Sequence, residues 1–146
     1  MKRIINADAE MSTALTQFSA EYFAVPWSEN GFIAEMEKPN SADYCCTDGE
    51  TVCGVACVED QFGDGYIHNI AVRNDRRREG IGGALMRECI DFAKKRGLEK
   101  LFLEVRVSNN AALALYGSLG FNILSVRKGF YDDPREDAYS MCLELL

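Results

Sequence analysis

A strand, a turn and a glycine-rich helix start follow one another between residues 66 and 83, and this segment constrains the chain more than any other. Residues 66–73, YIHNIAVR, alternate in polarity and predict a strand. Asn74 and Asp75 predict a turn, and RRREGIGG then leads into a helix. Glycine lets the backbone approach a ligand closely, and the first N–H groups of a helix have no internal partners. The segment therefore predicts a site for a phosphorylated cofactor.

The spacing of the glycines excludes two common phosphate loops. No Lys-Ser or Lys-Thr follows them, as a nucleoside triphosphate loop requires, and the Gly-x-Gly-x-x-Gly of dinucleotide folds is missing. What remains is Arg77-x-x-Gly80-x-Gly82, followed directly by Gly83. Taken alone, this pattern fits a solvated basic turn as well as a cofactor loop, so the rest of the chain has to decide.

Length and charge narrow the class of protein. We expect 146 residues to form one domain, residues 1–146, with a substantial core. The net charge of −7 disfavours nucleic-acid binding, through residues 76–78 or elsewhere, and suits a basic partner. No apolar run approaches the ~20 residues of a membrane span. The charged start MKRIINADAE does not resemble a signal peptide, so we expect a cytoplasmic protein without membrane contact.

Six cysteines raise the alternatives of a metal site and of disulfides. They form no Cys-x-x-Cys pair, and His68 is the only histidine. Metal sites usually need ligands at short paired spacings, and disulfides need an oxidising compartment. We therefore expect no metal, and we interpret the cysteines as small buried thiols.

The remaining patterns predict elements in the order β-α-α-β-β-β-α-β-α-β-β. The expected strands cover residues 3–6, 42–47, 51–59, 66–73, 100–106, 121–128 and 137–145. The expected helices run from Asp8 or Ser12 to residue 22, over 29–37 behind an N-cap at Ser28, from 82 to about 96, and over 109–119 behind Ser108. This order predicts an α/β (α+β) protein with a mixed sheet and helices on both faces.

Two polar side chains stand in otherwise apolar surroundings. In the strand over 100–106, Glu104 shares a face with Phe102 and Arg106. A carboxylate there has to be paired or hydrated, so an ion pair with an arginine and a catalytic role both fit. Tyr116 shares a helix face with Leu115, where a tyrosine is ordinarily a core residue.

Together these stretches resemble the GNAT N-acetyltransferases over nearly the whole chain. The glycine turn resembles their Arg/Gln-x-x-Gly-x-Gly/Ala loop, while PWSENGF, LEVRVSNNAALALYGSLGF and EDAYSMCLEL are similar to the bacterial ribosomal-protein-alanine N-acetyltransferases, the RimI family. The resemblance implies the GNAT fold and acetyl-CoA as co-substrate, with no metal. It also implies acetylation of a protein N-terminal amine, that of the N-terminal alanine of the eighteenth small-subunit ribosomal protein.

The resemblance further implies roles for single residues. Glu104 matches the family's general base, and Tyr116 matches the general acid that protonates the leaving thiolate. Trp27 and Tyr131 match parts that hold the acceptor peptide, although Trp27 also fits a half-buried anchor. The matched cofactor-binding residues are Ile70, Ala71, Val72, Arg77, Arg78, Glu79, Gly80, Ile81, Gly82, Gly83 and Asn109.

The acceptor is less constrained than the donor. Phe130-Tyr131 stands where the family usually has Tyr-Tyr, and the loop 132–135 is short. Asp132, Asp133 and Glu136 fit a basic N-terminal peptide of a ribosomal protein, or simply a solvated acidic loop. A small amine or a lysine side chain as acceptor, and a non-catalytic acetyl-CoA-binding module, remain alternatives. We expect a monomer and interpret His68 as structural, because the matched motif does not require it.

Overall fold

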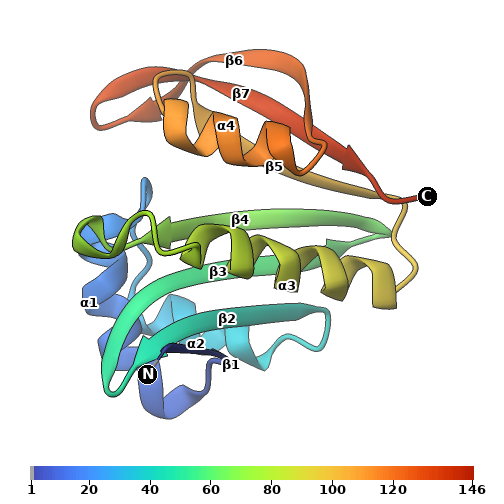
Figure 1. Cartoon of the computed structure of the whole chain (residues 1–146). Helices are drawn as coiled ribbons and strands as arrows, with labels where there is room; N and C mark the ends of the chain where they lie inside the picture. The colour runs from blue at the N-terminus through green and yellow to red at the C-terminus, as the bar shows by residue number, and fades with distance from the viewer. Residues whose placement is uncertain (1) are drawn as a thin grey trace.

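One seven-stranded mixed sheet, in the order β1-β2-β3-β4-β5-β7-β6, organises the computed structural model, which describes residues 2–146 (Figure 1). Its strands are β1 Lys2–Asn6, β2 Ser41–Asp48, β3 Thr51–Gln61, β4 Asp64–Val72, β5 Lys100–Arg106, β6 Asn122–Asp132 and β7 Arg135–Glu144. The helices are α1 Ser12–Tyr22, α2 Glu29–Glu37, α3 Ile81–Lys95 and α4 Asn110–Ser118, with short 3-10 turns at Ala9–Met11 and Asn74–Arg76. The predicted element order and fold class are confirmed.

Helices cover both faces of the sheet, and each face has its own core. In Figure 1, α3 and α4 lie in front of the sheet, and the stripe Leu85, Cys89 and Ala93 of α3 is fully buried there. On the other face, Leu15 of α1 and Phe32 of α2 pack against β2 and β3. Within residues 2–146, none of the helices combines the length and apolar character needed to cross a bilayer.

All six cysteines are buried free thiols, as the sequence predicted. They belong to β2, β3, α3 and β7, and all but Cys142 are small apolar members of the two cores. Burial raises the pKa of Cys45 to about 12, which makes its reactive thiolate inaccessible at neutral pH.

The neighbours β4 and β5 pair over only two positions, Gly65 with Leu101 and Tyr66 with Phe102. This is the one parallel pairing among the described strands. A Cβ on Gly65 would lie 2.9 Å from Leu101 Cδ1, so glycine permits the close approach. Beyond these pairs β4 follows β3 and β5 follows β7, and the two strands diverge.

The structure corrects two predicted boundaries near this divergence. Asn109, and not Ser108, caps α4, because Asn109 Oδ1 accepts a hydrogen bond from Ala112 N at 3.2 Å. Ser108 N is engaged elsewhere, donating to Glu136 Oε2 at 2.9 Å. The last two strands also continue to the pair Asp132–Arg135, so the expected loop 132–135 is a tight turn.

Candidate active site

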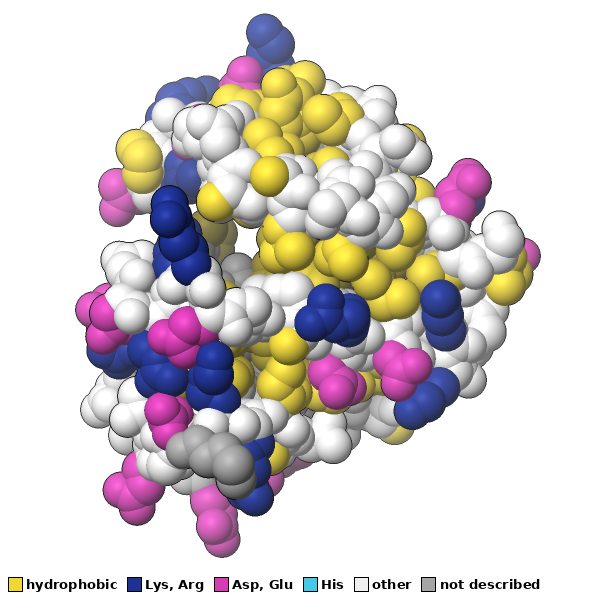
Figure 2. Space-filling view, in the orientation of Figure 1, with side chains coloured by type: hydrophobic (Ala, Val, Ile, Leu, Met, Phe, Trp, Pro, Cys, Tyr) yellow, Lys and Arg dark blue, Asp and Glu magenta, His cyan; other side chains and the backbone are white. Residues whose placement is uncertain are grey.

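Two clefts open where β4 and β5 diverge, and they run into one another. The β4–β5 cleft, of about 570 Å³, is bounded by residues 22–27, the two strands and the β6–β7 turn. The α3–α4 cleft, of about 580 Å³, lies between the end of β4 and the starts of α3 and α4. Figure 2 shows the surface hollowed between the part that carries β4 and the part that carries β5 and α4. Five residues line both clefts: Ile70, Ala71, Arg77, Asn109 and Tyr116.

The α3–α4 cleft has the features of an anion site. Gly80 has φ 78°, in the left-handed region, and this turn starts α3 at Ile81 with its first N–H groups open to the cleft side. Arg77 and Arg78 line the cleft, and neither forms an ion pair with any residue that the structure describes. The positive end of the helix dipole and two free guanidinium groups therefore face one space, which suits a diphosphate.

Of the predicted cofactor residues, all but Glu79 line this cleft. The Glu79 carboxylate instead accepts from Arg76 Nε at 2.9 Å and lies 3.0 Å from Lys2 Nζ. Arg76 also contacts Asp48 Oδ2 at 3.0 Å. An ion-pair network therefore ties the Glu79 side chain to the sheet, and the cofactor contact of this residue stays a prediction. From the sequence alone, Arg76, which forms these ion pairs, cannot be told apart from Arg77, which is available to a ligand.

Glu104 projects into the β4–β5 cleft, with its side chain 20% exposed. Among the described residues its one ion pair is with Arg127, whose Nη1 lies 4.0 Å from Glu104 Oε1 and whose own side chain is 56% exposed. A pair this long and this solvated contributes little to stability. The ion pair between Glu104 and Arg127 is therefore weak, and the Glu104 carboxylate stays accessible to a ligand.

Tyr116 lies at the junction of the two clefts and is 5% exposed. Burial, and secondarily the neighbouring Tyr131, raise the pKa of the Tyr116 hydroxyl well above its ordinary value. The phenol therefore stays protonated at neutral pH, as a proton donor must. Tyr116 also packs on Phe121, with ring centroids 5.9 Å apart, so it belongs to the core and to the site at once.

The two residues expected to hold an acceptor both line the β4–β5 cleft. Trp27 is half-buried against Phe32, with ring centroids 5.1 Å apart, which agrees with a packing anchor, while its contact with the acceptor stays a prediction. The guanidinium of Arg106 stacks over the Tyr131 ring at 4.3 Å. Among the acidic residues of the turn only Asp133 lines the cleft.

Glu136 does not line the cleft but forms hydrogen bonds that hold the turn in place. Hydrogen bonds from Ser108 N at 2.9 Å and from Arg106 Nη1 at 3.2 Å hold the pKa of Glu136 below its ordinary value. Arg106 also donates to the carbonyls of Asp133 and Pro134, so this network fixes the turn against β5.

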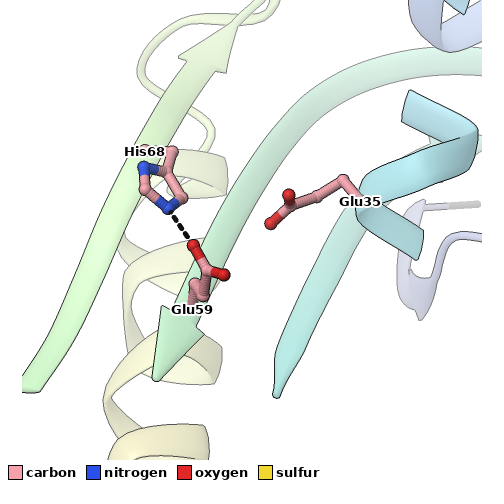
Figure 3. Close-up of side chains that lie close together, drawn as sticks. All are labelled: Glu35, Glu59 and His68. Carbon is pink, nitrogen blue, oxygen red and sulfur yellow. Dashed lines mark hydrogen bonds and ion pairs between the residues drawn. The ribbon is translucent and has the colours of Figure 1, made fainter. Parts of the chain in front are cut away.

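A polar network that the sequence did not reveal lies behind the β4–β5 cleft (Figure 3). His68 Nε2 is 2.7 Å from Glu59 Oε1, and Lys38 Nζ is 2.9 Å from Glu35 Oε2 and 3.3 Å from Glu59 Oε2. Burial opposes the charge on Glu59, but hydrogen bonds from Gln61 and His68 and the proximity of Lys38 lower the pKa of Glu59 to about 2.

Ligand-type atoms of Glu35, Glu59 and His68 lie within 4.8 Å of one another, an arrangement that also occurs at metal centres. Here the Lys38 ammonium already bridges the two carboxylates and supplies the positive charge that they require. We interpret the group as an ion-pair network. Its members are far apart in the sequence, and none lies in a recognisable motif.

Comparisons with known proteins agree with this geometry. Residues 12–121 match the Acetyltransferase (GNAT) family. The chain is 40% identical to the ribosomal protein bS18-alanine N-acetyltransferase of Escherichia coli (strain K12), over 84% of this chain and 83% of that protein. The crystal structure of the ribosomal-protein-S18-alanine N-acetyltransferase from Escherichia coli superposes with a TM-score of 0.87 at 35% identity, covering 99% of this chain and 94% of that one.

A further structure, that of yncA from Salmonella typhimurium with its cofactor acetyl-CoA, shares the fold. It superposes with a TM-score of 0.86 at 20% identity, over 99% of this chain and 94% of that chain. The fold expected from the sequence resemblance is therefore confirmed.

Proposed function

This chain belongs to the acetyltransferase (GNAT) family, and on that premise we propose that it transfers the acetyl group of acetyl-CoA to the N-terminal α-amine of a protein. The observation that carries the proposal is the junction of the two clefts at Tyr116, with Glu104 in one and the start of α3 in the other. The anion site for the donor and the cleft for the amine, which contains Glu104, would then meet beside Tyr116, where the acetyl group is transferred.

We assign the α3–α4 cleft to acetyl-CoA. The amides at the start of α3, together with Arg77 and Arg78, bind the pyrophosphate in this proposal. The strand backbone at Ile70 and Ala71, which line both clefts, holds the pantetheine arm and faces the thioester oxygen. Asn109 lines both clefts as well, and its amide NH₂ remains available while Oδ1 caps α4.

Glu104 and Tyr116 divide the proton transfers in this proposal. As the amine attacks the thioester carbon, Glu104 takes an N–H proton, directly or through a water molecule. As the C–S bond breaks, Tyr116 gives its proton to the departing thiolate. A phenol kept protonated by burial suits a thiol that ordinarily titrates near ~8.5.

The acceptor proposed is the N-terminal alanine of ribosomal protein bS18, as in the named relatives. Trp27, Tyr131 and the turn at Asp133 border the space that this peptide would enter. Of the two departures from the family pattern, Phe130 replaces a hydroxyl by an apolar ring on this border. We expect that change to alter hydrogen bonding to the peptide backbone without closing the cleft.

An acceptor panel tests the proposal. Purified protein is incubated with acetyl-CoA and with the bS18 N-terminal peptide, the same peptide blocked at its amine, an internal-lysine peptide, or spermidine, and the acetylated position is mapped by mass spectrometry. We expect acetylation of the free α-amine alone. Acetylation of spermidine or lysine would reassign the acceptor, and tight acetyl-CoA binding without turnover on any amine would indicate a non-catalytic module.

Variants at the two assigned residues test the mechanism separately. Glu104→Gln and Tyr116→Phe remove the proton-transfer groups with little change in shape. Losses of kcat of about 10²-fold or more are expected for each, because positioned acid–base groups contribute 10²–10⁴-fold. Wild-type kcat in either correctly folded variant would remove that residue from the mechanism.

A further inference from the structure

His68 occupies an irregular point of β4. The β3–β4 register passes from Cys57–Asn69 to Val58–Ile67, so His68 is the extra residue of a β-bulge. Bulges interrupt side-chain alternation and re-aim a side chain, frequently next to active sites. Ile67 and Ile70 both pack in the core on the α3 face, while the His68 ring lies on the other face, with its centroid 6.5 Å from that of Trp27.

His68 and Glu104 occupy equivalent positions on the two diverging strands. The last parallel pair is Tyr66–Phe102, whose rings stack with centroids 5.2 Å apart on the cleft face. His68 lies two residues beyond Tyr66, and Glu104 lies two residues beyond Phe102. Side chains two residues apart on a strand share a face. The His68 imidazole and the Glu104 carboxylate therefore line the β4–β5 cleft from opposite strands, just beyond the point where these strands separate.

The contacts of the imidazole leave one ring nitrogen for the cleft. Nε2 is held 2.7 Å from Glu59 Oε1, and Gln61 Nε2 approaches the same nitrogen at 3.5 Å. Figure 3 shows the other ring nitrogen on the side turned away from Glu59. Among residues 2–146, no group hydrogen-bonds to Nδ1. With Nε2–H donated to a carboxylate, Nδ1 carries a lone pair, and the carboxylate stabilises any proton added there.

The proposed reaction has to remove two protons from its acceptor. An α-ammonium carries three N–H protons and the amide product keeps one, while the thiol product takes up only one. Glu104 accepts the proton released as the C–N bond forms, and this proton replaces the one that Tyr116 gives to sulfur. The first proton, which must leave before the nitrogen can attack, has no assigned acceptor in this scheme.

We propose that His68, oriented by Glu59, is a second proton acceptor of the site. His68 Nδ1 takes the first proton from the acceptor's α-ammonium, the neutral amine attacks the thioester carbon, and the imidazolium later releases this proton to water. Glu59 acts as a positioning residue that fixes the tautomer and balances the charge. The inference deepens, and therefore rests on, the proposed N-terminal acetylation.

The charged groups around His68 are compatible with this role. Glu59 on β3 contacts the imidazole directly. Glu35 of α2 and Lys38, at the C-terminal end of α2, lie behind Glu59. Glu104 on β5 lines the same cleft as His68. Asp43 on β2 also interacts electrostatically with His68. Carboxylates outnumber the one ammonium in this group, so an imidazolium at this position would face carboxylates on several sides.

The pH dependence of kcat/KM for the bS18 N-terminal peptide, measured from pH 6 to 9.5, tests the role. A free α-amine titrates near ~8, so only about 3% of it is neutral at pH 6.5. We expect His68→Phe, which keeps the ring volume, to lose about 10-fold or more in kcat/KM at pH 6.5 and less than about 2-fold at pH 9. The acid limb of the variant should lie near ~8, the pKa of the free amine, and above that of the wild-type protein.

Two further variants separate chemistry from packing. His68→Gln keeps a donor for Glu59 without an ionisable nitrogen, and it should show the same pH-dependent loss. Asn40→Ala removes a 3.4 Å contact to the other oxygen of Glu59, away from the cleft, and should keep the wild-type profile. If the two His68 variants lost kcat/KM equally at every pH, or lost none, the role of His68 would be refuted while the proposed N-terminal acetylation would stand. If wild-type protein acetylated no α-amine at any pH, the proposed function would fail and this inference with it.

Discussion

The buried carboxylate of Asp43 provides a quantitative test of how burial affects the pKa of acidic groups next to the site. Asp43 lies on β2, is only 5% exposed, and its Oδ1 has no hydrogen-bond partner among residues 2–146. Burial, with the negative charge of Glu35 adding to it, raises the pKa of Asp43 to about 6. At neutral pH the folded protein therefore carries a charge that its surroundings disfavour, and Asp43→Asn should relieve this.

The expected size follows from proton linkage. The pKa rises from 3.8 in the unfolded chain to about 6 in the folded protein, a difference of about 2.2. At 1.36 kcal/mol per unit, this corresponds to about 3 kcal/mol of stability. Because the folded state binds the proton more tightly, this stability is present below pH 3.8 and is lost as the pH rises through 6. Asp43→Asn should therefore gain up to about 3 kcal/mol on wild type between pH 4 and pH 7.5.

Urea unfolding followed by the fluorescence of the single tryptophan, Trp27, measures this difference. Asp91→Asn is the matched control, because Asp91 is exposed and, among the residues that the structure describes, paired only with Lys95 at 3.0 Å. Its unfolding free energy should change by no more than about 0.5 kcal/mol, with no rise over the same pH range. A difference between Asp43→Asn and wild type that stays constant from pH 4 to pH 7.5 would refute the reasoning.

Three substitutions and one pH profile probe the donor side and the junction of the clefts. Gly80→Ala forces an L-residue to φ 78°, at a cost of about 1–2 kcal/mol; the turn should relax in the free protein, and re-forming it around the donor should weaken acetyl-CoA binding about 5–30-fold by calorimetry. Arg77→Ala should weaken acetyl-CoA binding and reduce its salt dependence, whereas Arg76→Ala, which breaks pairs with Glu79 and Asp48, should chiefly lower the thermal midpoint. Because burial raises the pKa of Tyr116, kcat should show no alkaline limb from this phenol below about pH 10.

Helices, strands and their buried faces followed from local patterns. The alternation over residues 100–106 placed Glu104 on one face of the strand with Phe102 and Arg106, and the burial pattern of β5 confirms that this face is less buried than the opposite one. The left-handed Gly80 and the helix after it also follow from a short motif, because backbone freedom and hydrogen-bonding needs depend on neighbouring residues. The N-cap of α4 did not follow from the sequence, since Ser108 and Asn109 are both good caps and only the hydrogen bond from Ala112 N to Asn109 Oδ1 identifies the cap.

The sequence by itself determined which segments are helix and strand, where the glycine turn lies, and which side chains stand out as candidate acid, base and anion-binding groups. Only the tertiary structure decided that β4 and β5 diverge after two pairs, that the two clefts meet at Tyr116, and that Glu59 and Lys38 stand behind His68. Periodicity is a property of neighbours along the chain. Register and divergence, by contrast, are set by how segments tens of residues apart share hydrogen bonds and core volume, and no local pattern encodes them.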